Sequence, residues 1–330
     1  MPNTFVSLFR RAALASAASL VCVSAQAAPE EITYLLPAPP NLPAFGPWMV
    51  AQQNGYYADE NLKVTFVAGK GGVDVAKQIG AGNAVIGGAI GDTPIIVRAN
   101  GVPVRAVAVL GAGSLTQIAV HDASTIKSVK DLKGKTLTVM AYTDTTYYAL
   151  LGSLRQVGLG KDDVSAQAAG PAGVWQLFAA NKSEAMAGVP DWVISAEDAG
   201  AKVRLLPSGD GFQSMAQSIL ASDDTIKTKP DLIKRLVRAT LRGMQDIITN
   251  PKAAAATYAK AVPSFQGKEA SVERIFTMYR DRVYAGQKTL GQIDAKRLDA
   301  VQKFYVSEGI VHKATPLEEL YTNQFVGIGR

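Results

Sequence analysis

Short apolar runs alternate with segments of helical pattern through most of the chain. The runs at residues 62–68, 84–89 and 102–110 have the length and composition of strands, and the segments between them have the apolar spacing of helices. A strand, a helix and a second strand in this order form a right-handed crossover between parallel strands. The same order returns from residue 135 to residue 206. The sequence therefore predicts an α/β protein with two successive groups of strands.

The last third of the chain has a helical pattern throughout, including an apolar stripe along residues 230–248. These helices need a sheet to pack on, and the extended run at residues 214–221 can return the chain to the first group of strands. We expect strands at residues 32–38, 62–68, 84–89, 102–110, 135–140, 164–168, 185–189, 203–206 and 214–221. We expect helices at residues 45–54, 73–79, 92–99, 145–157, 171–180, 191–199, 230–248, 252–261, 269–279 and 294–307.

This order predicts two lobes, in keeping with a length of 330 residues. The first lobe is expected to combine residues 28–116 with residues 217–330, and the second to contain residues 117–216. The chain would then cross between the lobes near residues 114–121 and again near residues 212–221. No internal repeat is visible in the sequence.

The N-terminus has the pattern of a secretory signal peptide at residues 1–27. Arg10 and Arg11 precede an uncharged apolar stretch at residues 12–23, and Ala25-Gln26-Ala27 matches the small-x-small cleavage pattern. The apolar stretch is shorter than the ~20 residues of a membrane-spanning helix, although an N-terminal membrane anchor remains the alternative. Cleavage after Ala27 would also remove Cys22, which is the only cysteine and follows a poor lipidation sequence. The mature chain would then have no disulfide, no thiolate nucleophile and no sulfur ligand for a metal.

The remaining composition argues against several function classes. The formal charge is +6, and no run of five basic residues occurs, so a nucleic-acid partner is not expected. His121 and His312 lie far apart, without the spacing of a metal site, and are expected to be structural or surface residues. The glycine-rich segment at residues 69–72 lacks the Gly-Lys-Ser/Thr ending of a phosphate loop. We therefore expect no metal, no cofactor and no catalytic residue.

Three stretches resemble one family of proteins. They are WMVAQQNGYYADENLKVTF at residues 48–66, SVKDLKGKTLTV at residues 128–139, and the long helix, Asn-Pro break and Ala-rich helix of residues 230–258. In this order they are similar to the periplasmic binding proteins for sulfonates, taurine, nitrate and thiamine-pyrimidine precursors. One departure is Asn61, which stands where the family has Gly. Asn is the next-best residue for a left-handed turn, so the resemblance holds there.

The resemblance implies a fold, a function and a location. The fold would be that of a type II-like periplasmic binding protein, each lobe a mainly parallel sheet flanked by helices, with a helical C-terminal part. The protein would be a periplasmic monomer that captures a small organic solute and delivers it to the membrane permease of an ABC importer. The alternative is an enzyme on the same fold, such as a pyrimidine-precursor enzyme of the thiamine pathway. The Cys-rich site of the pyrimidine synthases is missing from this sequence.

Candidate ligand-binding residues follow from the loops at the carboxyl ends of the strands, where α/β sheets bind ligands. Gly71 and Gly72 open one expected helix and allow close approach of a ligand, although a plain tight turn is the alternative. Thr143, Thr145 and Thr146 offer hydroxyls and amides at another helix start. That set suits a carboxylate or sulfonate. Asp144 lies within it and speaks against an anion, unless it caps the helix.

Aromatic and polar residues gather at the same loops. Large aromatic side chains provide apolar walls with a polar edge, and the candidates are Phe45, Trp48, Tyr142, Trp175 and Trp192. Tyr148 is expected in the core instead. The polar candidates, which either bind ligand or cap helices, are Asp92 and Asp191, with Asn41 and Gln117 as lesser ones. This set predicts an organic anion, such as a sulfonate or aromatic carboxylate, or a heteroaromatic compound, bound by closure of the two lobes.

Overall fold

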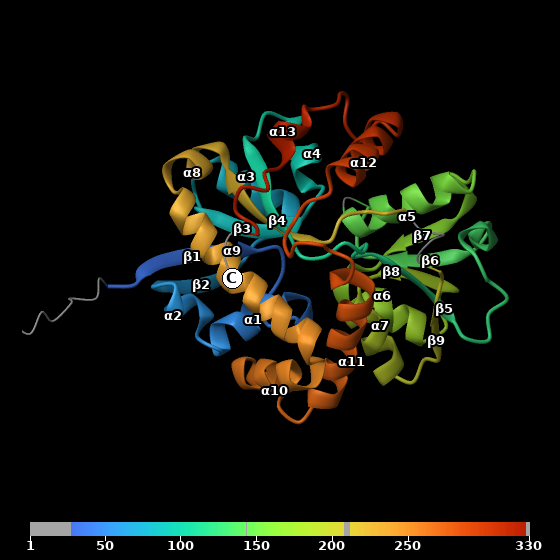
Figure 1. The fold of residues 1–330 in the computed structure, drawn as a ribbon. Helices are drawn as coiled ribbons and strands as arrows, with labels where there is room; N and C mark the ends of the chain where they lie inside the picture. Colours follow the sequence, from blue (N-terminus) through green and yellow to red (C-terminus); the bar gives the residue numbers. More distant parts are fainter. Residues whose placement is uncertain (1–27, 143, 208–211, 328–330) are drawn as a thin grey trace, which may run out of the picture.

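The chain forms two lobes side by side in a computed structural model that describes residues 28–142, 144–207 and 212–327 (Figure 1). The expected signal peptide, Cys22 and the candidate Thr143 lie outside the described residues. Each lobe is built on one five-stranded sheet with helices on its faces. We call the part built on the first sheet lobe 1 and the part built on the second sheet lobe 2. The predicted α/β fold class with two sheets is confirmed.

The sheet of lobe 1 has the strand order β2-β1-β3-β10-β4. Its strands are β1 (Glu30–Leu36), β2 (Leu62–Ala68), β3 (Ile86–Ile90), β4 (Val104–Val109) and β10 (Gln217–Ser222). Strand β1 pairs in parallel with β2 and β3, whereas β10 runs antiparallel to β3 and β4. The N-terminal helices of this lobe are α1 (Gly46–Gln53), α2 (Tyr56–Asp59), α3 (Gly72–Gly80) and α4 (Thr93–Arg98).

The sheet of lobe 2 has the equivalent order β7-β6-β8-β5-β9. Its strands are β5 (Gln117–His121), β6 (Thr136–Val139), β7 (Ser165–Ala168), β8 (Ala185–Gly188) and β9 (Val203–Leu205), and its helices are α5 (Thr145–Gln156), α6 (Gly170–Ala179) and α7 (Pro190–Asp198). Strand β6 pairs in parallel with β7 and β8, and β5 runs antiparallel to β8 and β9. Each sheet thus has four strands that run in one direction and one antiparallel strand that enters from the other lobe.

This equivalence is a structural repeat that the sequence does not show. Strands β3 and β8 occupy the same place in their sheets, and each is followed closely by an aspartate, Asp92 or Asp191. Strands β10 and β5 also correspond, and each begins with a glutamine. Gln217 pairs with Ile90 of β3, and Gln117 pairs with Gly188 of β8. The crossing strand β5 was expected only as a connection, because a short run between lobes has no partner visible in the sequence.

The C-terminal helices pack mainly on lobe 1 and reach lobe 2 at two places. They are α8 (Asp223–Thr228), α9 (Pro230–Thr249), α10 (Pro251–Ala261), α11 (Glu269–Tyr279), α12 (Ala295–Ser307) and α13 (Leu317–Leu320). The predicted apolar stripe of α9 is buried against α1. Gly243 allows this close approach, because a Cβ there would lie 2.1 Å from the carbonyl oxygen of Pro47. In Figure 1, α11 lies beside α7 and α12 lies on the side of α5.

Short helical turns complete the chain: η1 (Pro43–Phe45), η2 (Val129–Leu132), η3 (Lys161–Asp163), η5 (Pro263–Phe265) and η6 (Arg280–Tyr284). Asn61 has a φ of 53°, so it does adopt the left-handed conformation that its place in the turn requires. Among the described residues, no helix is long and apolar enough to cross a membrane. The described part of the chain also contains no cluster of His, Cys, Asp and Glu side chains that could hold a metal ion.

Candidate functional site

A cleft of about 730 Å³ lies between the two lobes. Lobe 1 lines it with the η1 turn and the first residues of α3 and α4, and lobe 2 lines it with the first residues of α5 and α7. The crossing segments contribute Leu115 and Gln217 at its base. A volume between about 300 and 1,000 Å³ is typical of small-molecule sites. The cleft therefore has the size and position of a site for one small organic molecule.

Aromatic and aliphatic side chains form the walls of the cleft. Phe45 is buried on the lobe 1 side, and Tyr148 and Trp192 are half-buried on the lobe 2 side. The Trp192 ring lies over Gly188 at the end of β8, where an added Cβ would be 3.0 Å from the indole Cε3 atom. The glycine thus lets the indole lie directly on the strand end. Such walls suit a planar apolar surface on the ligand.

Gln217 lines the cleft and carries an unsatisfied buried acceptor. Its Nε2 donates to the carbonyl oxygen of Ala44 at 2.7 Å, which fixes the amide orientation because a carbonyl can only accept. The Oε1 atom is buried and receives no hydrogen bond from any described residue. Leaving a buried acceptor without a partner costs about 1–3 kcal/mol.

Asp191 is a second buried acceptor, at the first turn of α7. Its Oδ1 accepts a hydrogen bond from the hydroxyl of Tyr279 in α11 at 3.0 Å, so this contact joins lobe 2 to the C-terminal helices. Burial raises the pKa of Asp191 to about 6, and the Tyr279 hydrogen bond acts in the opposite direction. Asp191 lines the cleft, and no other described side chain donates to it.

Asp92 takes the corresponding place in lobe 1 but lies behind the cleft wall. It is fully buried, and the hydroxyl of Tyr305 in α12 donates to its Oδ2 at 2.8 Å. Burial raises the pKa of Asp92 to about 6, against the effect of the Tyr305 hydrogen bond. The Tyr305 ring also meets Tyr148 of lobe 2 at a centroid distance of 5.8 Å. The neighbour of Asp92, Thr93, lines the cleft instead, and its buried Oγ1 has no described partner.

The start of α3 lies at the cleft and packs closely against β3. Gly71 has a φ of 94°, and Gly72 lies so near to β3 that an added Cβ would be 2.9 Å from Ala89 Cβ and 3.5 Å from Thr93 Oγ1. Both glycines line the cleft. Lys70 and Lys77 line it as well, with exposed side chains at its edge.

Asp144 caps α5, and its carboxylate accepts hydrogen bonds from Thr146 donors that the sequence analysis assigned to an anionic ligand. Its Oδ1 accepts from the backbone N–H of Thr146 at 2.9 Å and also from the Thr146 hydroxyl. Burial raises the pKa of Asp144, and these hydrogen bonds lower it. Thr145, Thr146 and Asp144 all line the cleft, so this helix start presents a carboxylate together with its donors.

Seven of the predicted ligand-binding residues line the cleft: Phe45, Gly71, Gly72, Thr145, Thr146, Asp191 and Trp192. Tyr148, expected in the core, lines it too. The sequence analysis missed Thr93, Leu115 and Gln217. For Gln217 the available signal was its correspondence with Gln117, which becomes visible only once the strand order is known.

The remaining described candidates lie elsewhere. Trp48 is 1% exposed in the core of lobe 1, because it faces the sheet beside Tyr34. Asn41 is exposed, and its backbone oxygen accepts from Tyr258. Tyr142 is 54% exposed and donates to the carbonyl of Ala166. Trp175 packs on the hydrophobic cluster of lobe 2 that includes Phe178.

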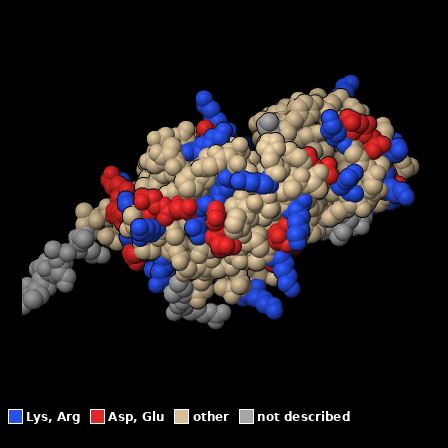
Figure 2. Space-filling view, turned by 90° about the horizontal axis from the view of Figure 1, so that it is seen from above, with Lys and Arg blue, Asp and Glu red and all other residues tan. Residues whose placement is uncertain are grey.

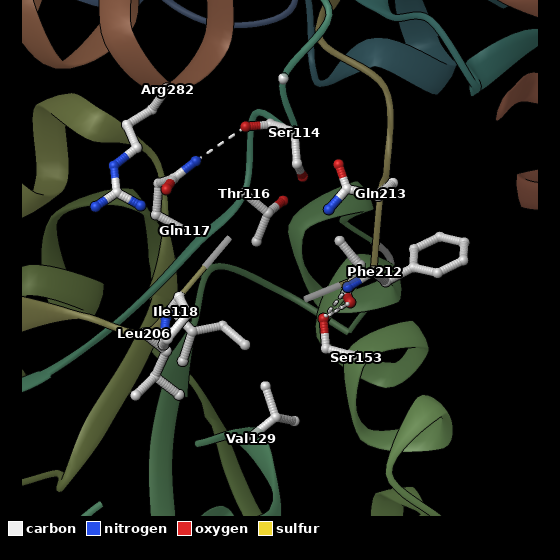
Figure 3. Close-up of a pocket in the computed structure, with 13 residues that line it drawn as sticks. Ser114, Thr116, Gln117, Ile118, Val129, Ser153, Leu206, Phe212, Gln213 and Arg282 are labelled. Atoms are coloured by element: carbon white, nitrogen blue, oxygen red, sulfur yellow. Dashed lines mark hydrogen bonds between the residues drawn. The ribbon is translucent and has the colours of Figure 1, made fainter. Parts of the chain in front are cut away.

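Gln117 lines a second, smaller cavity of about 70 Å³ beside the crossing segments (Figure 3). Its Nε2 donates to the carbonyl oxygen of Ser114, and the backbone N–H of Phe212 donates to Ser153 Oγ. Ser114 and Thr116 face this cavity, whereas Leu115 between them lines the main cleft. Successive side chains of an extended segment point to opposite sides, so this segment separates the small cavity from the main cleft. His121, in the same strand as Gln117, stacks on Phe178, as expected of a structural histidine.

The two five-stranded sheets and the interlobe cleft define the fold of the periplasmic binding proteins. Residues 42–254 match the family model described as NMT1/THI5 like, and the chain belongs to this family. The chain is 25% identical over 310 residues to the riboflavin-binding protein RibY of Chloroflexus aurantiacus, covering 92% of this chain and 88% of that protein.

Solved structures share the fold at lower identity. The periplasmic aliphatic sulphonate binding protein SsuA from Escherichia coli superposes with a TM-score of 0.71 at 18% identity, covering 90% of this chain and 93% of SsuA. The desulfurization enzyme DSZB superposes with a TM-score of 0.56 at 15% identity, covering 90% of this chain and 97% of the enzyme. The fold is therefore used by binding proteins and by at least one enzyme.

Proposed function

We propose that this protein is the substrate-binding component of an ABC importer. It captures one small organic solute in the cleft between its lobes and delivers the solute to a membrane permease. The family, the RibY relative and the expected signal peptide support this role and a periplasmic location. The observation that carries the proposal is the cleft itself, which both lobes line with buried polar residues: Thr93 and Gln217 from lobe 1, and Thr146 and Asp191 from lobe 2.

Capture would work by closure of the lobes around the ligand. Ligand contacts on both lobes are made together only in the closed form, so the ligand shifts the population toward that form. Tyr279 of α11 and Tyr305 of α12 reach across the lobe boundary and contact Asp191 and Tyr148 of lobe 2. We propose that the chain bends at the boundaries 116/117 and 216/217, where β5 and β10 begin. A permease would recognise the closed form of a monomer.

An enzyme on the same fold is the competing function. The described residues that line the cleft include no His and no Cys, and the available carboxylates are Asp74, Asp144 and Asp191. Asp144 caps α5, and Asp191 accepts from Tyr279. The one hydroxyl–carboxylate pair among the described lining residues is that of Thr146 and Asp144, in which the carboxylate also accepts from the backbone N–H of Thr146 as the cap of α5. The lining supports binding without turnover.

The test is a ligand screen on the purified mature protein. Thermal shift would be measured with flavins, pyrimidines, alkanesulfonates and aromatic carboxylates, and each hit would be titrated by calorimetry. Binding of one ligand per protein, recovered unchanged by chromatography, is the expected result. At a hundredfold excess over Kd the stabilisation should be about 2.7 kcal/mol. Conversion of a compound at substoichiometric protein would establish the enzyme instead.

A further inference from the structure

We infer that Arg297 of α12 is a positioning residue that sets the relative orientation of the two lobes, because its guanidinium holds both connections between them. The first connection, residues 111–116, leads from lobe 1 into β5, and the second, residues 212–216, leads from lobe 2 into β10. The link to solute capture rests on the proposed function, since apparent affinity falls with the fraction of protein in the binding-competent orientation.

The side chain of Arg297 donates to backbone carbonyls of both connections. Its Nε donates to the carbonyl oxygen of Gln213 at 2.9 Å, and its two terminal nitrogens donate to those of Ala112 and Ser214. Burial lowers the pKa of Arg297 to about 10, so the guanidinium is charged at neutral pH and its hydrogen bonds are charge-assisted. One planar group with fixed donor directions thus joins α12 to two segments that are far apart in the sequence.

The second connection passes from lobe 2 to lobe 1 where the guanidinium holds it. At one end, the backbone N–H of Phe212 donates to Ser153 Oγ of α5 in lobe 2 at 2.8 Å. At the other end, the carbonyl oxygen of Ala216 accepts from the backbone N–H of Gly91 in lobe 1 at 2.9 Å. A change in lobe orientation must therefore alter the course of the chain between these two anchors. The hydrogen bonds from Arg297 to this segment oppose that change.

The first connection is fixed to lobe 1 and to the second connection. The backbone N–H of Gly113 donates to the carbonyl oxygen of Val283 in η6 at 2.9 Å. A Cβ added at Gly113 would clash with the backbone carbonyl of Arg282, so glycine permits this contact. The hydroxyls of Ser114 and Ser214 share a hydrogen bond of 2.6 Å, which joins the two connections. The two connections are therefore linked to each other as well as to Arg297.

Open space borders both connections. The cavity of about 70 Å³ lies beside Ser114 and Gln213 (Figure 3). Another cavity, of about 490 Å³, is bordered by Ala112, Met215 and Arg297. Because close packing does not fill these spaces, the hydrogen bonds of the guanidinium contribute more to holding the connections in place.

The experiment measures the orientation of the lobes directly and without ligand. Spin labels would be attached at Lys63→Cys in β2 of lobe 1 and at Asp162→Cys in η3 of lobe 2, where the native side chains are 67% and 92% exposed. The one native cysteine is Cys22, so protein produced from residue 28 onward carries labels at these two sites alone. Double electron–electron resonance then gives the distribution of distances between the labels.

Substitutions of Arg297 are compared with a matched arginine. Arg297→Met removes all three hydrogen bonds and should broaden the distance distribution by more than about 2 Å, the scale of domain rearrangements. Arg297→Lys keeps the charge without the planar fork, should also broaden the distribution, and provides the test if Arg297→Met folds poorly. Arg204→Met is the control, because Arg204 donates to the carbonyl oxygens of Ser124 and Ile126 within lobe 2 alone. It should lower stability in urea unfolding and leave the distance distribution unchanged.

The outcomes separate this inference from the proposed function. Broadening in a folded Arg297 variant, with an unchanged distribution in Arg204→Met, supports the inference. An unchanged width in every folded Arg297 variant, or equal broadening in Arg204→Met, overturns it and leaves the proposed function intact. The proposed function fails instead on the ligand screen, which does not depend on the labels.

Discussion

Replacement of Asp191 by Asn should make the protein more stable and a worse ligand binder. The carboxylate of Asp191 is buried, and its pKa is raised by that burial to about 6 from 3.8. Asn has nearly the same shape and retains an oxygen that can accept from the Tyr279 hydroxyl. The substitution therefore removes a buried negative charge and retains the hydrogen bond that joins α7 to α11.

The size of the effect follows from the pKa. Because the folded-state pKa is above the unfolded one, the folded protein binds more protons between these two values. The free energy of unfolding therefore falls as the pH rises from about 4 through about 6. A pKa raised from 3.8 to about 6 corresponds to about 3 kcal/mol of lost stability above pH 7. Asp191→Asn should regain most of this at pH 7.5 and almost none at pH 4.

Urea unfolding at pH 4, 6 and 7.5 measures this directly. The slope of the free energy of unfolding against pH should decrease by the contribution of one carboxyl group. Part of the slope should remain, because Asp92 is buried with a pKa of about 6 as well. Asp162→Asn is the control, since the side chain of Asp162 is 92% exposed and should not change stability at any pH.

The reasoning is refuted if Asp191→Asn is no more stable than the original protein at pH 7.5. That result would mean that interactions with the surrounding residues compensate fully for the hydration free energy that the carboxylate loses on burial. A gain of stability together with weaker ligand binding would be the signature of a residue kept for function at a cost to the fold.

Three further predictions concern the walls and contacts of the lobes. Trp192→Ala should weaken ligand binding at least tenfold by calorimetry, whereas Trp175→Ala, outside the cleft lining, should leave affinity unchanged; the reverse pattern would move the site to α6. Gly243→Ala should lower stability in urea unfolding by about 1–3 kcal/mol, because its Cβ would clash with the backbone of α1; unchanged stability would show that α9 shifts freely. Arg274 joins α11 to Glu197 and Asp198 of α7 through partly exposed ion pairs, so Arg274→Ala should weaken ligand affinity by up to about fivefold, or about 1 kcal/mol. An unchanged Kd at low salt would exclude a role for these pairs in closure.

The surface charges raise no expectation of a further charged partner. Figure 2 shows Lys and Arg side chains interspersed with Asp and Glu on the face in view, without a stripe of one sign. Several charged side chains of the described chain are paired, as in the contacts of Arg235 with Glu30 and of Arg238 with Glu60. The charge distribution on this face therefore indicates no binding site for a charged macromolecule there.

Local signals were sufficient for most elements of the fold. The alternation of apolar runs and helical patterns predicted the two sheets. Burial of one face of a helix or strand gives the apolar residues the spacing that is typical of that element. Helix starts were also readable: Asp294 accepts from the backbone N–H of Lys296, and Asn250 accepts from that of Ala253. The left-handed turn at Asn61 followed in the same way from the conformational preference of its side chain.

The site was predicted only in part, because a loop position does not fix the direction of a side chain. Trp192 and Trp175 both follow strand ends, yet only Trp192 lines the cleft. Trp48 lies in the predicted helix, but its face of α1 packs on the sheet. Gln217 stands in an apolar run that looks like core, and its role depends on where β10 enters the sheet.

The sequence by itself determined the class of fold, the helix boundaries and the turns, since these depend on neighbours within a few residues. The tertiary structure decided which side chains share the cleft. Tyr279 reaches Asp191 across 88 residues of sequence, and Tyr305 reaches Asp92 across 213. Contacts over such separations depend on the packing of α11 and α12 against both lobes. No local pattern encodes that packing, because it is fixed by the whole set of buried surfaces at once.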